Sequence, residues 1–191
     1  MAKVLLAVAD GSEDIETVTL IDVLRRADVR VTVASVMAEP VVTLSRGTRL
    51  VADTRLEALD EDADFDAIVL PGGMPGAEHL RDTGHLTALL QRQRDGGGWI
   101  AAICAAPGIV LARHDLVRGH VVTGYPAFQA ALEDAGGHLS QQPVVEDGRL
   151  LTSQGPGTAM AFALHLVRLL VDDATERRIA EGLLMELAGQ Y

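Results

Sequence analysis

The sequence predicts an α/β protein with a parallel sheet that is covered by helices on both faces. Short apolar runs typical of buried strands alternate along the chain with segments of helical spacing. With 191 residues, of which 48% are hydrophobic, the chain can bury one sizeable core. Because no repeat, low-complexity tract or linker divides it, we predict a single domain over residues 1–191.

The first half of the chain supplies three predicted strands and one predicted helix. A β-rich run, residues 3–9, ends at the turn "DGSED", whose acids suit a helix N-terminus. Helical spacing follows over residues 13–27. The second strand covers residues 30–36, and the third is the apolar run 67–73, which Pro and Gly stop.

The second half continues the alternation. A helix over residues 83–94 precedes the strand "WIAAI", and the intervening "GGG" is a turn. Two runs around "EDG", residues 144–145 and 150–152, indicate a hairpin. The loop "SQGPGT" opens a long helix through "AMAFALHLVRLLV", and a last helix covers residues 174–187.

Parallel sheets bind ligands at the carboxyl ends of their strands, where the loops gather. Three predicted loops belong to that edge, residues 10–16, 71–76 and 103–106. We expect these loops to converge on one site.

Cys104, the only cysteine of the chain, lies where a strand gives way to a helix, in "AICAA". A nucleophile on such a sharp turn needs small residues two positions before and after it, and here these are Ala102 and Ala106. The positive end of the following helix is expected to lower the thiol pKa and favour thiolate. On this pattern alone, a free cysteine that packs as a small hydrophobe is an equal alternative.

Two glycine-containing loops are candidates for backbone contacts with a ligand. In "LPGGMPG", paired glycines after a strand allow close approach, and their N–H groups can stabilise an oxyanion, although a plain turn explains them too. The loop "SQGPGT" has a similar composition and is interpreted as structural, with its helix start near the cleft.

Glu16 is the candidate acid/base in "GSEDIET". Glu13 and Asp14 mark the helix start, where acids usually face solvent. Glu16 is a turn further in, and if it faces the sheet edge, desolvation raises its pKa and enables proton transfer. A solvated Glu16 is the alternative that the sequence leaves open.

These motifs together resemble the ThiJ/PfpI superfamily, in particular the branch of bacterial YajL and the human parkinsonism-associated deglycase. The resemblance covers nearly the whole chain through "GSEDIETVTLIDVLRRA", "SRGTRLVAD", "FDAIVLPGGMPGAE", "IAAICAAPGIVLA", "VVTGYP" and "LLTSQGPGTAMAFAL". It implies a flavodoxin-like three-layer α/β sandwich, a nucleophile-elbow cysteine and a homodimer.

The resemblance also implies roles for individual residues. Cys104 matches the reactive, easily oxidised nucleophile, and Glu16 matches the acid whose protonated carboxyl hydrogen-bonds the sulfur. The oxyanion corner of the family is lined by backbone N–H groups, which match Gly72, Gly73 and Ala105. Two arginines near the dimer interface, which help to form the cleft, match Arg26 and Arg46.

One departure from the human relative lies in "TGYP", where Tyr125 replaces a histidine close to the cysteine. The YajL type carries an aromatic residue there as well. Without a Cys–His dyad or an amidotransferase triad, a peptidase or amidase mechanism lacks its base.

The composition of the chain limits the kinds of ligand and partner that we expect it to bind. The six histidines show no metal-ligand spacing, and His165, in an apolar helix, is interpreted as a core histidine; we expect no metal and no cofactor. A net charge of −11 and 3% aromatic residues argue against a nucleic-acid surface. No run is long enough to span a membrane, and the first residues lack the features of an export signal, so we expect a cytoplasmic protein.

Two functions from different classes follow. The first is an enzyme for reactive dicarbonyls and their early adducts, of the glutathione-independent glyoxalase or deglycase type, acting on small aldehydes and on glycated proteins. The second is a redox-responsive chaperone or stress sensor, in which Cys104 is oxidised to sulfinate and the oxidised form guards client proteins.

Overall fold

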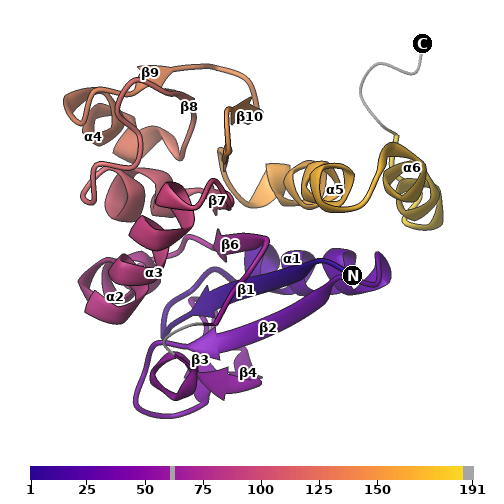
Figure 1. Ribbon diagram of the computed structural model, residues 1–191, viewed down its shortest axis with the longest axis horizontal. Helices are drawn as coiled ribbons and strands as arrows, with labels where there is room; N and C mark the ends of the chain where they lie inside the picture. The colour runs from indigo at the N-terminus through magenta and orange to yellow at the C-terminus, as the bar shows by residue number, and fades with distance from the viewer. Residues whose placement is uncertain (61–62, 187–191) are drawn as a thin grey trace.

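The computed structural model describes residues 1–60 and 63–186 and confirms an α/β sandwich with a mostly parallel sheet (Figure 1). Among these residues, seven strands pair in one sheet in the order β10-β11-β7-β6-β1-β2-β5. In the same order they cover Val144–Asp147, Leu150–Ser153, Trp99–Ile103, Ala67–Leu70, Lys3–Val8, Arg30–Ser35 and Thr54–Arg55. All pairs are parallel except β10 with β11, which form the predicted hairpin. Taken in chain order, β1, β2, β6, β7 and β11 have the 2-1-3-4-5 arrangement of flavodoxin-like folds.

Two short ladders lie outside this sheet, and the sequence patterns do not predict them. β3 (Val41–Thr43) pairs antiparallel with β4 (Arg49–Val51), and β8 (Val121–Val122) pairs with β9 (His138–Leu139). Strands of two or three residues are too short to show a period in the sequence.

Helices cover both faces of the sheet (Figure 1). One layer holds α1 (Asp14–Arg26), α5 (Ala159–Leu170) and α6 (Asp173–Gly182), of which α1 and α6 pack against α5. The other layer holds α2 (Gly76–Asp82), α3 (Gly84–Asp95) and α4 (Gln129–Asp134), with α3 on β6 and β7. Short 3-10 and π turns cover Leu56–Ala58, Pro107–Leu111, Pro126–Phe128 and Pro156–Thr158.

Two helix predictions need correction. The predicted helix over residues 83–94 corresponds to α3, but α2, which the sequence patterns do not predict, precedes it directly. The extended backbone of Thr83 (φ −85°, ψ 102°) separates the two helices. The last predicted helix, residues 174–187, ends earlier, at Gly182, because Leu184 has a positive φ of 57°. Leu187 itself lies outside the described residues.

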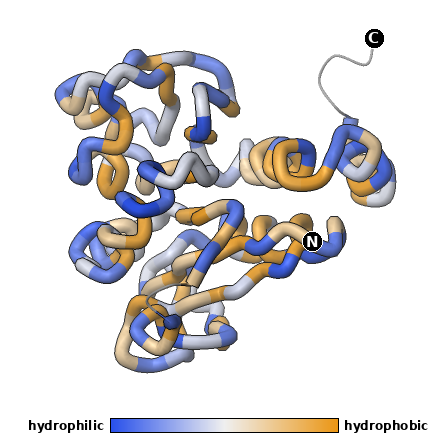
Figure 2. The backbone as a smooth tube through the Cα atoms, in the orientation of Figure 1, coloured by the Kyte–Doolittle hydropathy of each residue, from blue (hydrophilic) through white to orange (hydrophobic). Residues whose placement is uncertain are grey.

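The core is formed by the central strands, as their apolar runs predict. Every residue of β6 and β7 is buried, because helices cover both faces of these strands. In Figure 2 the hydrophobic segments of β1 and α5 lie toward the middle of the fold.

The three loops at the carboxyl edge converge, as predicted. The Glu13 N–H donates to Gly72 O at 3.0 Å, which joins the loop before α1 to the loop after β6. A Cβ atom on Gly72 would lie 2.7 Å from the Cβ of Cys104, so the loop after β7 contacts the same point. Only glycine allows this approach of backbones.

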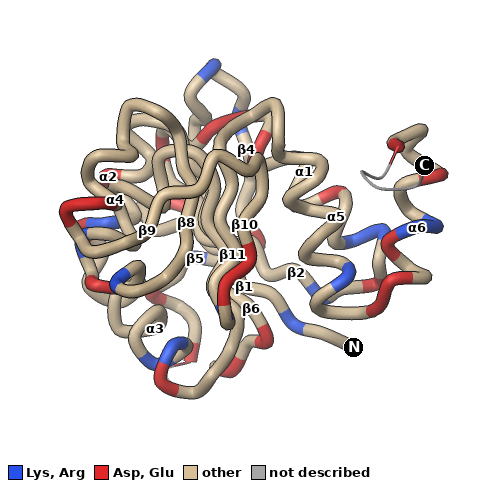
Figure 3. The backbone as a smooth tube through the Cα atoms, turned by 90° about the horizontal axis from the view of Figure 1, so that it is seen from above, with Lys and Arg blue, Asp and Glu red and all other residues tan. Residues whose placement is uncertain are grey.

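Charged side chains lie mainly at the surface. The red stretch of β10 in Figure 3 is formed by Glu146 and Asp147 at the edge of the sheet. None of the helices in the part of the chain described here is long and apolar enough to cross a membrane.

Candidate active site

Cys104 lies directly after β7, at the junction with the next helical turn. It is 7% exposed and has a φ of 65°, a left-handed conformation that costs a non-glycine residue about 1 kcal/mol or more. Its backbone is held by two hydrogen bonds, from its N–H to Ser153 O at 2.9 Å and from the Tyr125 N–H to its O at 2.8 Å. Strain of this kind at a strand–helix junction is the backbone geometry that a nucleophile elbow requires.

Two backbone N–H groups, from Gly73 and Ala105, are directed at the Cys104 thiol and favour its anionic form. Burial nevertheless raises the pKa of Cys104 to about 12, and the negative charge and hydrogen bond of Glu16 add to this increase. The predicted lowering of the thiol pKa is therefore wrong beside an ionised Glu16. The two donors act in the predicted direction but are outweighed.

Glu16 is fully buried in the first turn of α1, so the alternative of a solvated Glu16 is wrong. Its Oε2 accepts the Gly72 N–H at 2.8 Å, and its own backbone N–H is capped by the Glu13 carboxylate at 2.8 Å. Burial raises the pKa of Glu16 to about 7, against the opposing hydrogen bonds of Gly72 and Cys104, and the charge of Glu13 raises it further. Oε1 is buried without a hydrogen bond of ordinary geometry, which leaves it able to exchange a proton.

The Glu16 carboxyl and the Cys104 thiol interact and form one titrating pair. Removing the first proton leaves a monoanion in which Glu16 is ionised and the Cys104 thiol keeps its proton, hydrogen-bonded to the carboxylate. Removing the second would place two negative charges together in a buried site, which is why the thiol pKa is so high beside ionised Glu16. Near pH 7 the pair is therefore poised to hold one proton and to move it.

The three predicted backbone donors divide between the two acidic groups. Gly73 and Ala105 direct their N–H groups at the sulfur, as the resemblance implies. The Gly72 N–H instead donates to the Glu16 carboxyl at 2.8 Å. Gly72 thus positions the acid, and only the other two donors face the sulfur.

Asp14 has a positioning function that its place at a helix start does not reveal. Asp14 Oδ2 accepts the Arg46 N–H at 2.8 Å and the Ser45 hydroxyl at 3.1 Å, which ties the β3–β4 turn to the start of α1. Burial opposes ionisation, but hydrogen bonds from Thr48, Arg46 and Ser45 lower the pKa of Asp14 below its ordinary value. Glu13 and Asp14 are both partly exposed, and the carboxylate of each also accepts a backbone N–H group.

The two predicted arginines lie in different places. Arg46 is exposed on the turn that Asp14 holds, next to the loop that begins α1. Arg26 is in the last turn of α1, half exposed and paired with Asp22 at 2.6 Å. Ten residues of helix, roughly 15 Å, separate Arg26 from Glu16, so within one chain it is not part of this site. A role for both at an interface between two copies stays a prediction.

Tyr125 lies beside Cys104 through the backbone bond given above, and its side chain is 44% exposed. Its ring lies over the "SQGPGT" loop, since a Cβ on Gly155 would be 3.4 Å from its Cδ2. The Phe128 ring is 6.3 Å from it, centre to centre. The structure therefore brings Tyr125 to the site, as predicted.

No group of three or more His, Cys, Asp or Glu side chains in the described ranges is arranged to hold a metal ion. His165 is not a core histidine, which corrects the prediction. It is partly exposed on α5, and its Nε2 lies 2.6 Å from Glu146 and 2.8 Å from Arg168.

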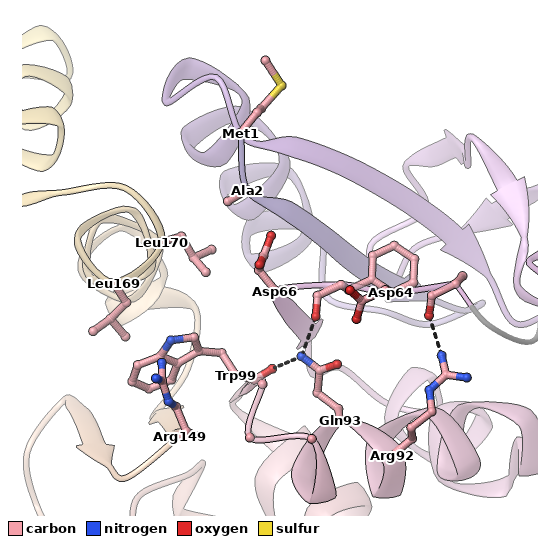
Figure 4. A pocket seen from close by; sticks show the side chains of 15 residues that line it. Met1, Ala2, Asp64, Asp66, Arg92, Gln93, Trp99, Arg149, Leu169 and Leu170 are labelled. Carbon is pink, nitrogen blue, oxygen red and sulfur yellow. Dashed lines mark hydrogen bonds between the residues drawn. The ribbon is translucent and has the colours of Figure 1, made fainter.

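A separate cavity of about 860 Å³ lies at the amino-terminal edge of the sheet, at the other end of β7 from Cys104 (Figure 4). Trp99, with the Arg149 guanidinium 4.9 Å from its ring centre, forms one wall. On the other side Gln93 donates to the carbonyls of Phe65 and Trp99. The cavity contains neither member of the Cys104–Glu16 pair.

The fold and the site define a class: a flavodoxin-like α/β protein with a strained, buried cysteine and an adjacent carboxyl group at the carboxyl edge of its sheet. The DJ-1/PfpI family matches residues 2–169, and the chain belongs to this family.

Relatives in the family match nearly the whole chain. The chain is 40% identical to protein dj-1beta of Drosophila melanogaster over 181 residues, which are 95% of this chain and 96% of the relative. It is 36% identical over 169 residues to "Glutathione-independent glyoxalase DJR-1.2" of Caenorhabditis elegans, with 88% of each chain covered. The solved structure "Toxoplasma gondii DJ-1, oxidized" is 41% identical, covers 98% of this chain and 100% of its own, and superposes with a TM-score of 0.94.

Proposed function

We propose that this protein is a glutathione-independent glyoxalase that converts reactive dicarbonyls such as methylglyoxal into hydroxy acids. The observation that carries the proposal is the buried Glu16 carboxyl, with a pKa of about 7, in contact with the Cys104 thiol. A thiol and an acid/base that titrates near neutrality are the two groups that this reaction needs. A family relative that bears the name glutathione-independent glyoxalase supports the same function.

The reaction begins from the monoanionic pair: the ionised Glu16 carboxyl takes the proton of the Cys104 thiol, which places the negative charge on sulfur. The Cys104 thiolate attacks the aldehyde carbon of methylglyoxal, and the C=O bond becomes an alkoxide as the S–C bond forms. Glu16 gives its proton to this oxygen, which yields a neutral hemithioacetal. The N–H groups of Gly73 and Ala105, directed at the sulfur, stabilise the charge before attack.

The second stage moves hydrogen from one carbon to its neighbour. The Glu16 carboxylate removes the proton from the former aldehyde carbon, and the electron pair forms an enediolate with the ketone carbon. Return of that proton to the second carbon, with transfer of the hydroxyl proton from the first oxygen to the second, gives a thioester, in which the first carbon is oxidised and the second reduced. Water then adds to the thioester, releases lactate and restores the Cys104 thiol, so the sum is methylglyoxal plus water to lactate.

Early adducts of dicarbonyls with amino, thiol or guanidino groups carry the same reacting carbons. We therefore include hydrolysis of such adducts on proteins, the deglycase reaction, within the proposed function. In place of the first addition step, the Cys104 sulfur would form its S–C bond at the adduct carbon as the C–N or C–S bond breaks, and Glu16 would give its proton to the departing amine or thiol.

The experiment mixes purified protein with methylglyoxal in glutathione-free buffer and follows lactate by proton NMR. Cys104→Ser and Glu16→Gln are compared with the wild type, and Glu57→Gln, an exposed residue remote from the site, is the matched control. Lactate from the wild type and the control only, at many molecules per thiol, is the expected result. Equal lactate from all four proteins, or none from any, would exclude the proposal.

A second candidate function, a redox-responsive stress protein or chaperone, is favoured by the two N–H groups directed at the Cys104 sulfur. These donors would stabilise a sulfinate as they stabilise a thiolate, and the chain has no second cysteine to form a disulfide. One solved relative, from Toxoplasma gondii, is an oxidized DJ-1. Intact mass after mild peroxide tests this: a stable gain of two oxygens at Cys104 supports it, and oxidation confined to methionines counts against it.

We also propose that the protein is a homodimer. Ile15 and Val18, one turn apart on α1, and Val51 on β4 are large apolar side chains that are about half exposed or more. A second copy would cover such a surface. Sedimentation velocity of the wild type and of Val18→Asp tests it, since a dimer that uses this face should dissociate in the variant.

A further inference from the structure

Cys104 lies between two loops that come from the neighbouring strands of its sheet. β7 pairs with β6 on one side and with β11 on the other. After β6, Gly73 directs its N–H at the sulfur, and the next residue is Met74, whose side chain is 41% exposed. On the β11 side, the Cys104 N–H is bonded to Ser153, which begins the "SQGPGT" loop.

Tyr125 covers this second side. Its backbone is fixed to the Cys104 carbonyl at 2.8 Å, and its ring is supported by Gly155 below and by Phe128 at 6.3 Å. A ring held at both its backbone and its flank has little freedom to lose when a ligand packs on it.

The polar chemistry of the site is concentrated on its buried side, where Glu16 and the Gly73 and Ala105 N–H groups surround the sulfur. Two large, mostly apolar side chains are exposed on residues next to the backbone partners of Cys104: Tyr125, whose N–H bonds the Cys104 carbonyl, and Met74, which follows Gly73. A substrate whose carbonyl carbons face the thiol directs its remaining group toward the exposed side of the site, to which these two side chains belong.

We propose that Tyr125 and Met74 determine specificity, and that the site prefers α-oxoaldehydes that carry a bulky apolar or aromatic substituent over those with a small one. This inference rests on the proposed glyoxalase function. Packing of an aromatic substituent on the Tyr125 ring stabilises bound substrate and transition state beyond what a methyl group can do. The expected preference for phenylglyoxal over methylglyoxal is about 3- to 10-fold in kcat/KM, the range of one aromatic pair.

The test measures initial rates of mandelate formation from phenylglyoxal and of lactate formation from methylglyoxal, before arginine side chains are modified. The ratio of the two kcat/KM values is compared among wild type, Tyr125→Ala, Tyr125→Phe and Met74→Ala. We expect the ratio to fall several-fold in Tyr125→Ala, less in Met74→Ala, and to be kept in Tyr125→Phe. An unchanged ratio in Tyr125→Ala overturns the inference, as does an equal fall in Tyr125→Phe, which would assign the effect to the hydroxyl.

A second measurement separates failure of this inference from failure of the proposed function, because it does not require turnover. Cys104 is alkylated with bromoacetophenone or with bromoacetone, which have the shapes of the two substrates, and the adduct is followed by intact mass. Each rate is divided by that of N-acetylcysteine. A wild-type preference for the phenyl reagent that is lost in Tyr125→Ala supports the inference even if neither aldehyde is turned over. If the ratio of the normalised rates for the two reagents is the same in the wild type and in Tyr125→Ala, the inference is overturned.

Discussion

The two edges of the central sheet differ in how they are built. At the carboxyl edge, backbone segments from three loops approach so closely that a Cβ on Gly73 would lie 2.4 Å from Gly11 O. At the amino edge the strands leave a cavity of about 860 Å³, and a Cβ on Gly97 there would meet nothing within 4 Å. The amino edge, which we call the roomy edge, holds no cysteine. The carboxyl edge, which we call the crowded edge, holds the Cys104–Glu16 pair. The Cys104–Glu16 pair is thus desolvated and faced by close backbone donors, conditions that the cavity at the amino edge does not provide.

The largest expected effect tests this difference in packing through one substitution at each edge. Gly73→Ala must relieve a backbone clash at a φ of +87°, and we expect it to lower the free energy of unfolding by about 4 kcal/mol. Gly97→Ala, at a φ of +71° in open space, costs only the backbone conformation, about 1 kcal/mol. Urea denaturation measures both. Equal losses would mean that the close approach at the carboxyl edge contributes nothing of its own.

The next effect concerns the buried acid of the crowded edge. The pKa of Glu16 is raised from 4.5 to about 7 on folding, so the folded protein keeps a proton that the unfolded chain releases. The free energy of unfolding is therefore highest, for this group, below pH 4.5 and falls as the pH rises through about 7, by up to about 3 kcal/mol.

The measurement compares wild type with Glu16→Gln by urea denaturation at pH 5 and pH 8. Because glutamine does not titrate, the loss of stability between these two values should shrink in the variant. An identical loss in both proteins would show that Glu16 is not the group responsible.

A smaller effect tests how the crowded edge is held together. Removing the Asp14 carboxylate leaves the Arg46 N–H and the Ser45 hydroxyl without their acceptor, which costs about 1 kcal/mol. Hydrogen exchange at the Arg46 amide should become faster in Asp14→Ala. Asp22→Ala, which removes only a surface ion pair with Arg26, is the matched control and should leave that amide unchanged.

The smallest effect belongs to the roomy edge. Arg149→Ala removes a guanidinium from the face of Trp99 and should lower the free energy of unfolding by about 0.5–1 kcal/mol. Methylglyoxal turnover, measured in the same preparation, should equal that of the wild type. A large loss of turnover would mean that the two edges are coupled.

The sequence predicts which loops meet at the crowded edge better than it predicts the contacts between them. Cys104 and the convergence of the loops follow from local patterns, since turn residues and apolar runs mark the strand ends. The burial of Glu16 cannot be read locally, because it depends on Gly72, 56 residues away. Asp14 is missed for the same reason: an acid at a helix start has the same local pattern whether it faces water or holds a distant turn.

The cavity at the amino edge has no signal in the sequence. It arises where the ends of β1, β6 and β7 meet the end of α5, and no single segment records that packing. Glycines that line it, such as Gly97, look in the sequence like those of any turn.

The most direct test of the central claim, that Glu16 and Cys104 work as one proton-sharing pair, is the pH dependence of kcat/KM for methylglyoxal from pH 5 to 9. In the wild type, activity should rise through about pH 7 as the pair loses its first proton. Glu16→Gln should be slower by about 100-fold or more and should lack that rise. A variant that keeps both the wild-type rate and the rise near pH 7 would contradict the account.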